Sequence, residues 1–127
     1  MAVTCSQPSV RPGAQRSLEL ALAAAREAEE NRGQDVIVLD LRDQSSVFDY
    51  FVIATGTSNR QLRAMSDAID EVLQRRMGHP RLGIEGYQQT RWILLDYGSV
   101  VIHLFDEATR DYYRLEDLWA GARRVPR

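Results

Sequence analysis

The chain has 127 residues, of which 44% are hydrophobic and 27% are charged, a composition typical of one soluble globular domain. No apolar run approaches the roughly 18 residues that a membrane span needs, and the N-terminus lacks a signal pattern, so we expect a cytoplasmic protein without a membrane partner. The single cysteine, Cys5, excludes an internal disulfide bond and a cysteine-rich zinc site.

The charges are distributed unevenly, and all 16 basic residues are arginines. Residues 1–16 and 123–127 hold five arginines and no acid, which leaves 11 arginines against 18 acids, a net charge of −7, in residues 17–122. A body with this charge repels a phosphate backbone and attracts a basic surface. We therefore expect a basic protein as partner and little direct nucleic-acid binding.

The first third of the chain predicts a leader, a helix and a strand. Residues 1–15 have no hydrophobic period and contain Pro and Gly, which predicts a disordered leader. Ser17 is the expected N-cap of a helix rich in Ala, Leu and Glu that ends at Gly33. The β-branched run over residues 35–41 predicts a buried strand.

The middle of the chain adds a second strand over residues 50–55 and an amphipathic helix over residues 59–77, where apolar residues recur three and four apart. Residues 78–90 hold three glycines and a proline and are interpreted as a loop. Residues 91–105 predict an antiparallel hairpin that turns around residues 96–99.

A turn and a short helix over residues 115–120 close the predicted domain, which spans residues 16–121 and is followed by a basic tail over residues 122–127. The order of strands and helices indicates an α/β fold: a single domain with a mixed β-sheet of about five strands flanked by helices.

The junction between the second strand and its helix reads Gly56-Thr57-Ser58, a place where phosphate-binding loops occur because free amides at a helix N-terminus favour anions. The second glycine and the lysine of a P-loop are missing. We interpret the segment as a tight turn with Ser58 as N-cap. An enzyme that handles nucleotides remains the alternative.

Four carboxylates, Asp40, Asp43, Asp49 and Asp96, are the candidate ligands of a catalytic metal. Asp40 and Asp43 lack the alternate spacing that places two side chains on one strand face, and Asp96 lies at the predicted turn. Roles in turns and on the solvated surface therefore explain them better.

The sequence also offers no set of residues for nucleophilic catalysis or for metal binding. Cys5 falls in the leader, His79 stands beside a loop proline, and His103 lies within a strand, where a packed and hydrogen-bonded histidine is the common outcome. We expect no enzyme activity, no metal and no cofactor.

Large amphipathic residues gather in the last third of the chain. Such residues serve either as core or as binding hot spots, and the sequence leaves both interpretations open. They are Trp92, Tyr97, Phe105, Tyr112, Tyr113 and Trp119.

Residues 35–119 closely resemble the ribosomal silencing factor family (RsfS, also called Iojap). The matching motifs are DYFVIATGTS from Asp49, WILLDYG from Trp92 and VIHLF from Val101, followed by Arg110, Tyr113, Leu115-Glu116 and Leu118-Trp119. The resemblance implies a nucleotidyltransferase-like fold without catalytic carboxylates. It also implies binding to the large ribosomal subunit through its fourteenth protein (uL-fourteen), where the factor blocks joining of the small subunit and represses translation.

Organelle relatives of this family act in assembly of the large subunit, so such a role is the alternative. A homodimer is a further partner that the resemblance leaves open.

The resemblance points to the hairpin and the closing helix as the surface that binds the ribosomal protein, with Trp92 as the first anchor. Strand alternation separates Trp92 and Leu94 from Ile93 and Leu95, so at least half of the candidates are expected to lie in the core. The candidate binding residues are Glu85, Trp92, Asp96, Tyr97, Tyr113, Leu115, Glu116, Asp117 and Trp119.

Overall fold

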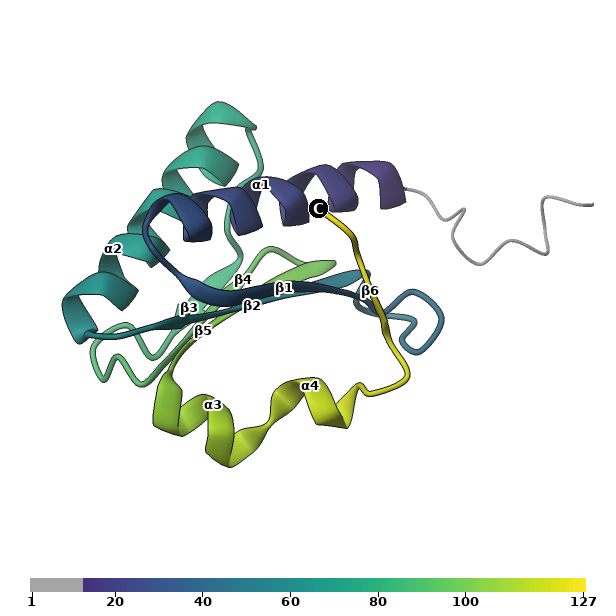
Figure 1. Ribbon diagram of the computed structural model, residues 1–127. Helices are drawn as coiled ribbons and strands as arrows, with labels where there is room; N and C mark the ends of the chain where they lie inside the picture. Colours follow the sequence, from purple (N-terminus) through teal and green to yellow (C-terminus); the bar gives the residue numbers. More distant parts are fainter. Residues whose placement is uncertain (1–12) are drawn as a thin grey trace, which may run out of the picture.

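The computed structural model describes residues 13–127, so the predicted leader over residues 1–15 lies outside the described residues except for its last three. The helices lie on both sides of one sheet (Figure 1). The elements are, in chain order, α1 (Ala14–Glu30), β1 (Gln34–Asp40), β2 (Tyr50–Gly56), α2 (Asn59–Asp70), η2 (Glu71–Arg76), β3 (Gly83–Glu85), β4 (Trp92–Asp96), β5 (Val100–Asp106), α3 (Glu107–Tyr113), α4 (Leu115–Leu118) and β6 (Arg123–Arg124).

The six strands form one sheet in the order β3-β4-β5-β2-β1-β6. β2 and β5 pair in parallel and the other neighbours pair antiparallel, which confirms the predicted mixed sheet. β2 is buried along its whole length, as expected for a central strand covered by helices on both faces. The two strands that the sequence did not predict, β3 and β6, are the short edge strands.

Side chains of each strand alternate between two hydrophobic clusters, one on each face of the sheet. α1 and α2 cover one face, and the smaller pair α3 and α4 covers the other (Figure 1). The cluster beneath α1 and α2 includes Val38, Val52, Ile93, Ile102 and Leu104. The cluster on the α3–α4 face is built from Leu39, Leu41, Phe51, Ile53, Val101, Phe105 and Leu115.

The first helix begins earlier than predicted. α1 starts at Ala14 after its N-cap Gly13, whose φ is +81°, and Ser17 lies inside the helix with its amide bonded to the carbonyl of Gly13. Ser17 is therefore not the N-cap. Its buried hydroxyl shares a hydrogen bond of 2.6 Å with the hydroxyl of Ser99, which ties α1 to the hairpin turn.

The second helix begins as predicted, because the Ser58 hydroxyl accepts the amide of Gln61 and caps it. α2 ends at Asp70 and continues as the π-helical η2 up to Arg76, so together they span nearly the predicted range.

The C-terminal residues 122–127 are not a free tail. β6 pairs with β1, the amide of Val125 donates to the carbonyl of Val38 at 2.9 Å, and Arg127 lies 2.7 Å from a carboxylate oxygen of Glu29 on α1. These contacts fold the arginine-rich end against the domain. Upstream, the turn predicted before the last helix is a helix of its own, α3.

The backbone conformation at position 86 requires glycine, so replacing Gly86 is expected to destabilise the fold. Its φ is +81°, and a Cβ at this position would collide with the carbonyl oxygen of Trp92. Gly86→Ala is expected to lower the free energy of unfolding by ~2 kcal/mol or more in urea denaturation. Gly83→Ala is the matched control, because Gly83 has open space and an ordinary φ. Equal stability of the two variants would contradict this account.

Candidate functional site

β4 divides its side chains between the two faces of the sheet as predicted. Ile93 and Leu95 are fully buried beneath α1 and α2, whereas Trp92, Leu94 and Asp96 alternate with them and stay partly exposed on the α3–α4 face. Glu85 of β3 pairs in register with Leu94, which places the exposed Glu85 beside this row. We call Glu85, Trp92, Leu94 and Asp96 the β4 row.

Trp92 is held by contacts on its rings and on its polar edge. Its ring centroid lies 4.8 Å from that of Phe105 and 5.0 Å from that of Tyr113. Its indole Nε1–H donates to Nδ1 of His103 at 3.1 Å. The exposed part of Trp92 lines a groove of about 460 Å³ together with Tyr112, Tyr113, Arg91, Ala108 and Thr109.

The aromatic contacts continue beneath α4. The ring of Phe51 lies 4.6 Å from His103 and 5.7 Å from Trp119, in edge-to-face arrangements that aromatic pairs prefer. The predicted residues Trp92, Tyr113 and Trp119 are thus parts of one aromatic layer between the sheet and α3–α4. Tyr112, which is 80% exposed, was not among the predicted binding residues and belongs to the same groove.

Two predicted binding residues are buried. Leu115 is 8% exposed and packs in the cluster beneath α3 and α4. Tyr97 is 2% exposed on the other face, where its hydroxyl donates to Asp70 at 2.6 Å. Burial and the neighbouring Asp70 raise the pKa of Tyr97 above its usual value. Both residues are core, but the other seven candidates are partly or fully exposed, so the expectation that at least half of them lie in the core is wrong.

The two predicted acids of α4 form ion pairs. Glu116 Oε2 lies 3.1 Å from Nε of the buried Arg110, and Asp117 lies 3.7 Å from Arg114 on the surface. The ion pair with Arg110 therefore holds Glu116 in place, whereas the ion pair between Asp117 and Arg114 is exposed to solvent and weak.

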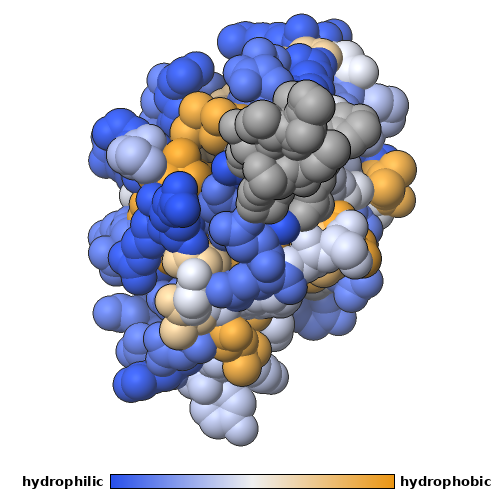
Figure 2. Space-filling model, turned by 90° about the vertical axis from the view of Figure 1, so that its right-hand side faces the viewer, coloured by the Kyte–Doolittle hydropathy of each residue, from blue (hydrophilic) through white to orange (hydrophobic). Residues whose placement is uncertain are grey.

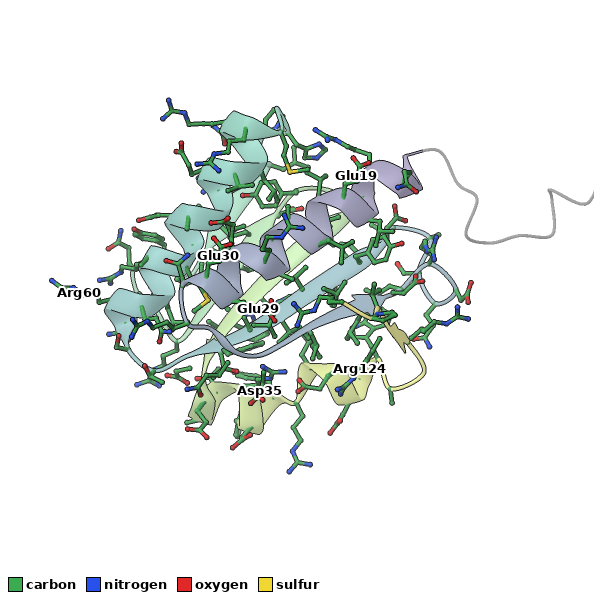
Figure 3. All side chains as sticks on the ribbon, turned by 45° about the horizontal axis from the view of Figure 1, so that its top comes forward. Glu19, Glu29, Glu30, Asp35, Arg60 and Arg124 are labelled. Atoms are coloured by element: carbon green, nitrogen blue, oxygen red, sulfur yellow. The ribbon has the colours of Figure 1, made fainter. Side chains whose placement is uncertain are left out.

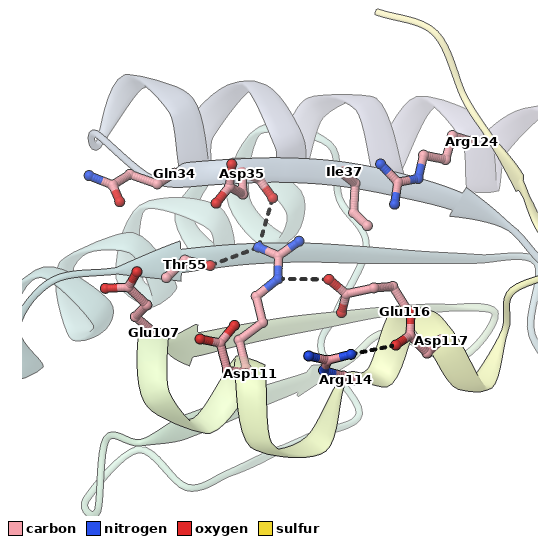
Figure 4. Close-up of a pocket in the computed structure, with 11 residues that line it drawn as sticks. Gln34, Asp35, Ile37, Thr55, Glu107, Asp111, Arg114, Glu116, Asp117 and Arg124 are labelled. Atoms are coloured by element: carbon pink, nitrogen blue, oxygen red, sulfur yellow. Dashed lines mark hydrogen bonds and ion pairs between the residues drawn. The ribbon is translucent and has the colours of Figure 1, made fainter.

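Arg110 lines a polar cleft of about 420 Å³ between α3–α4 and the ends of β1 and β2 (Figure 4). Its Nη1 donates to the carbonyl of Asp35 and to the hydroxyl of Thr55, each at 2.7 Å, and its Nε donates to Glu116. This network ties α3 and α4 to the sheet. The sequence matched Arg110 to the family motif but gave no signal for its burial.

The segment Gly56-Thr57-Ser58 is a structural turn. The side chain of Gln61 accepts hydrogen bonds from the amide and hydroxyl of Thr57, and the Ser58 hydroxyl accepts the amide of Gln61. A Cβ on Gly56 would lie 2.7 Å from a methyl carbon of Leu62, so helix packing explains this glycine. These contacts support the interpretation as a capped turn.

The carboxylates tested as metal ligands lie in other roles. Asp40 accepts two side-chain bonds from Arg42, at 2.8 and 2.6 Å, and this hydrogen bonding holds the pKa of Asp40 below its usual value. Asp96 accepts the amide of Gly98 in the hairpin turn. Within residues 13–127, no group of three or more His, Cys, Asp or Glu side chains could hold a metal ion. In the same range no helix is long and apolar enough to cross a membrane.

The α3–α4 side of the molecule is acidic. Residues 106–119 hold five acids and two arginines, a net charge of −3, and the β4 row adds Glu85 and Asp96. On the opposite face, Glu19, Glu29 and Glu30 lie along α1 (Figure 3). At the end of the molecule that carries the start of α1 and the β1–β2 loop, hydrophobic residues form small separate patches among hydrophilic ones (Figure 2).

Comparisons with known proteins find consistent matches. A family model described as "Ribosomal silencing factor during starvation" matches residues 14–127. "Ribosomal silencing factor RsfS" of Chromobacterium violaceum is 38% identical over 103 residues, covering 81% of this chain and 84% of the relative. The protein of the same name in Bacillus subtilis is 37% identical over 99 residues, covering 78% and 83%.

A mouse relative named "Mitochondrial assembly of ribosomal large subunit protein 1" is 34% identical over 114 residues, covering 88% of this chain and 49% of that protein. Among solved structures, a crystal structure of a Chromobacterium violaceum protein matches with a TM-score of 0.78 and 36% identity, covering 87% of this chain and 90% of that one. A Bacillus halodurans crystal structure matches with a TM-score of 0.72 and 34% identity, covering 89% and 99%.

The buried hydroxyl of Tyr97 predicts a stability effect. Tyr97→Phe removes the hydrogen bond to Asp70 and keeps the ring, so the free energy of unfolding is expected to fall by about 1 kcal/mol in urea denaturation. Tyr112→Phe is the control, because Tyr112 is mostly exposed and its change should leave stability unaltered. A Tyr97→Phe protein as stable as the parent would show that this hydrogen bond contributes nothing.

Proposed function

This chain belongs to the ribosomal silencing factor (RsfS) family, and we propose that it binds the large ribosomal subunit through its fourteenth protein, uL-fourteen, and blocks joining of the small subunit. Repression of translation follows, because a large subunit that cannot join forms no complete ribosome. We propose the cytoplasm as the compartment. The support comes from the names of the relatives and from the partly exposed aromatic and acidic surface on the α3–α4 side.

We assign the contact to the groove at Trp92 and to the β4 row. A partly exposed tryptophan packed on other aromatic rings resembles the rigid anchors that dominate binding energy at protein interfaces. This is the observation that carries the assignment. Tyr112 and Tyr113 add exposed aromatic area beside Trp92, and Leu94 adds an apolar neighbour.

The charge of this side of the molecule fits a basic partner. Glu85 and Asp96 lie on the same face of the sheet as Trp92, and α3–α4 carries a net charge of −3. Such a surface attracts a basic ribosomal protein during encounter and repels the phosphates of bare RNA.

The proposed mechanism is occupancy and requires no chemical step. Subunit joining uses contacts at fixed positions, so a small domain seated on that surface excludes the small subunit. Only binding free energy is needed, and a Kd of about 1 μM corresponds to roughly −8 kcal/mol.

A role in assembly of the large subunit is the second candidate, favoured by the name of the mouse relative. It would use the same binding surface on an immature particle. The two candidates separate in a cell that lacks this protein: accumulation of incomplete large subunits during growth supports assembly, whereas normal subunits that fail to be silenced on starvation support the main proposal.

Truncation of the anchor tests the binding surface. Trp92→Ala is expected to weaken binding to purified large subunits by ~2 kcal/mol or more, about a 30-fold rise in Kd, in co-sedimentation. Val47→Ala is the control, because Val47 is 66% exposed on the β1–β2 loop, at the other end of the sheet from Trp92. Circular dichroism verifies the fold of both variants. A folded Trp92→Ala protein that binds like the parent would contradict the assigned surface.

A further inference from the structure

His103 lies in the middle of β5 on the α3–α4 face and is 4% exposed. Its Nδ1 accepts the indole N–H of Trp92 at 3.1 Å, which assigns the proton of the neutral ring to Nε2. Nε2 is buried and has no hydrogen-bond partner among the described residues. His103 thus accepts a hydrogen bond from Trp92 at Nδ1, while its Nε2–H has no acceptor among the described residues.

This arrangement costs folding free energy, because a buried donor without a partner has lost its hydrogen bonds to water. The neighbours of His103 are aromatic: Phe51 contacts it edge to face at 4.6 Å between centroids, and Phe105 lies parallel at 6.2 Å. An apolar ring would make similar contacts without the penalty. Burial lowers the pKa of His103 to about 3, so the ring is neutral at physiological pH and Nδ1 remains an acceptor.

The hydrogen bond to His103 fixes the direction of the indole N–H of Trp92, which its other contacts do not engage. Pairing with Phe105 across β4 and β5 fixes the backbone of Trp92, and the rings of Phe105 and Tyr113 contact its indole without engaging Nε1. Ring contacts are tolerant of rotation within the ring plane, whereas a hydrogen bond is directional. His103 therefore defines where the polar edge of the indole points, and with it which part of the ring lines the groove.

We propose that His103 is a positioning residue for partner binding, which keeps the Trp92 indole in its binding orientation at a cost to the stability of the fold. The inference rests on the proposed function, because it assumes that Trp92 is the anchor. Without the acceptor, the partly exposed indole turns Nε1 towards water and the groove loses its preformed shape.

A double-mutant cycle tests this coupling. His103→Phe keeps an aromatic ring and removes the acceptor, and it is expected to raise the Kd for large subunits about tenfold. In a Trp92→Phe background, which has no indole to position, the same change is expected to have no further effect. An equal loss in both backgrounds would overturn the proposal, because His103 would then act on binding by another route.

Stability distinguishes positioning from a purely structural role. The His103→Phe protein is expected to unfold at the same or a higher urea concentration than the parent while it binds more weakly. A loss of stability in parallel with the loss of binding would overturn the proposal.

The free protein provides a readout that does not depend on ribosome binding. The chain has two tryptophans, so Trp119→Phe identifies the indole N–H signal of Trp92 in a ¹⁵N-edited NMR spectrum. This signal is expected to exchange slowly with water and to lose that protection in His103→Phe. If the Trp92 indole N–H stays protected in His103→Phe, the positioning role is overturned. If the protection is lost as expected but the parent protein does not bind large subunits, the proposed function fails and the positioning of Trp92 by His103 stands.

Discussion

The antiparallel ladder between β4 and β5 determines which side chains reach the proposed binding surface. It sets Trp92 opposite Phe105 and Leu94 opposite His103, so a register shift of one residue would send Trp92 beneath α1 and α2 and bring Ile93 to the α3–α4 face. The short turn at Gly98, held by the Asp96 carboxylate, sets that register. The exposed anchor and the buried core of this strand therefore depend on the same pairing.

The helices on the two faces of the sheet differ in length, and the shorter pair leaves part of its face open to the proposed partner. α1 and α2 bury one face completely along β4, where Ile93 and Leu95 have no exposed area. α3 and α4 are short, and the edge near β3 keeps the β4 row partly exposed. The cleft beside β1 and β2 is lined by Arg110, whose hydrogen bonds to Asp35 and Thr55 tie α3 to the sheet.

Much of this fold could be predicted from local sequence patterns. The β-branched runs identified β1 and β2, the hydroxyl of Ser58 identified the start of α2, and the alternation of β4 separated Trp92 from Ile93. The missed elements depend on distant contacts. β6 exists because its backbone finds the free edge of β1, although Arg123 and Arg124 have no strand pattern of their own. Ser17 looked like a cap, but Gly13 begins the helix and Ser17 bonds to Ser99, 82 residues away.

The candidate site was also predictable only where local sequence patterns determine it. Alternation and the family resemblance pointed to Trp92, but the hydrogen bond of the Tyr97 hydroxyl depends on Asp70 from α2, and the link between Trp92 and His103 depends on strand pairing.

The central claim is that this domain acts by occupying the large subunit. The direct measurement is the yield of joined ribosomes when purified small and large subunits are mixed after the large subunits have been incubated with excess protein. The account predicts a yield that falls with the fraction of large subunits occupied and recovers with Trp92→Ala. A full yield of joined particles from large subunits that carry the bound protein would contradict it.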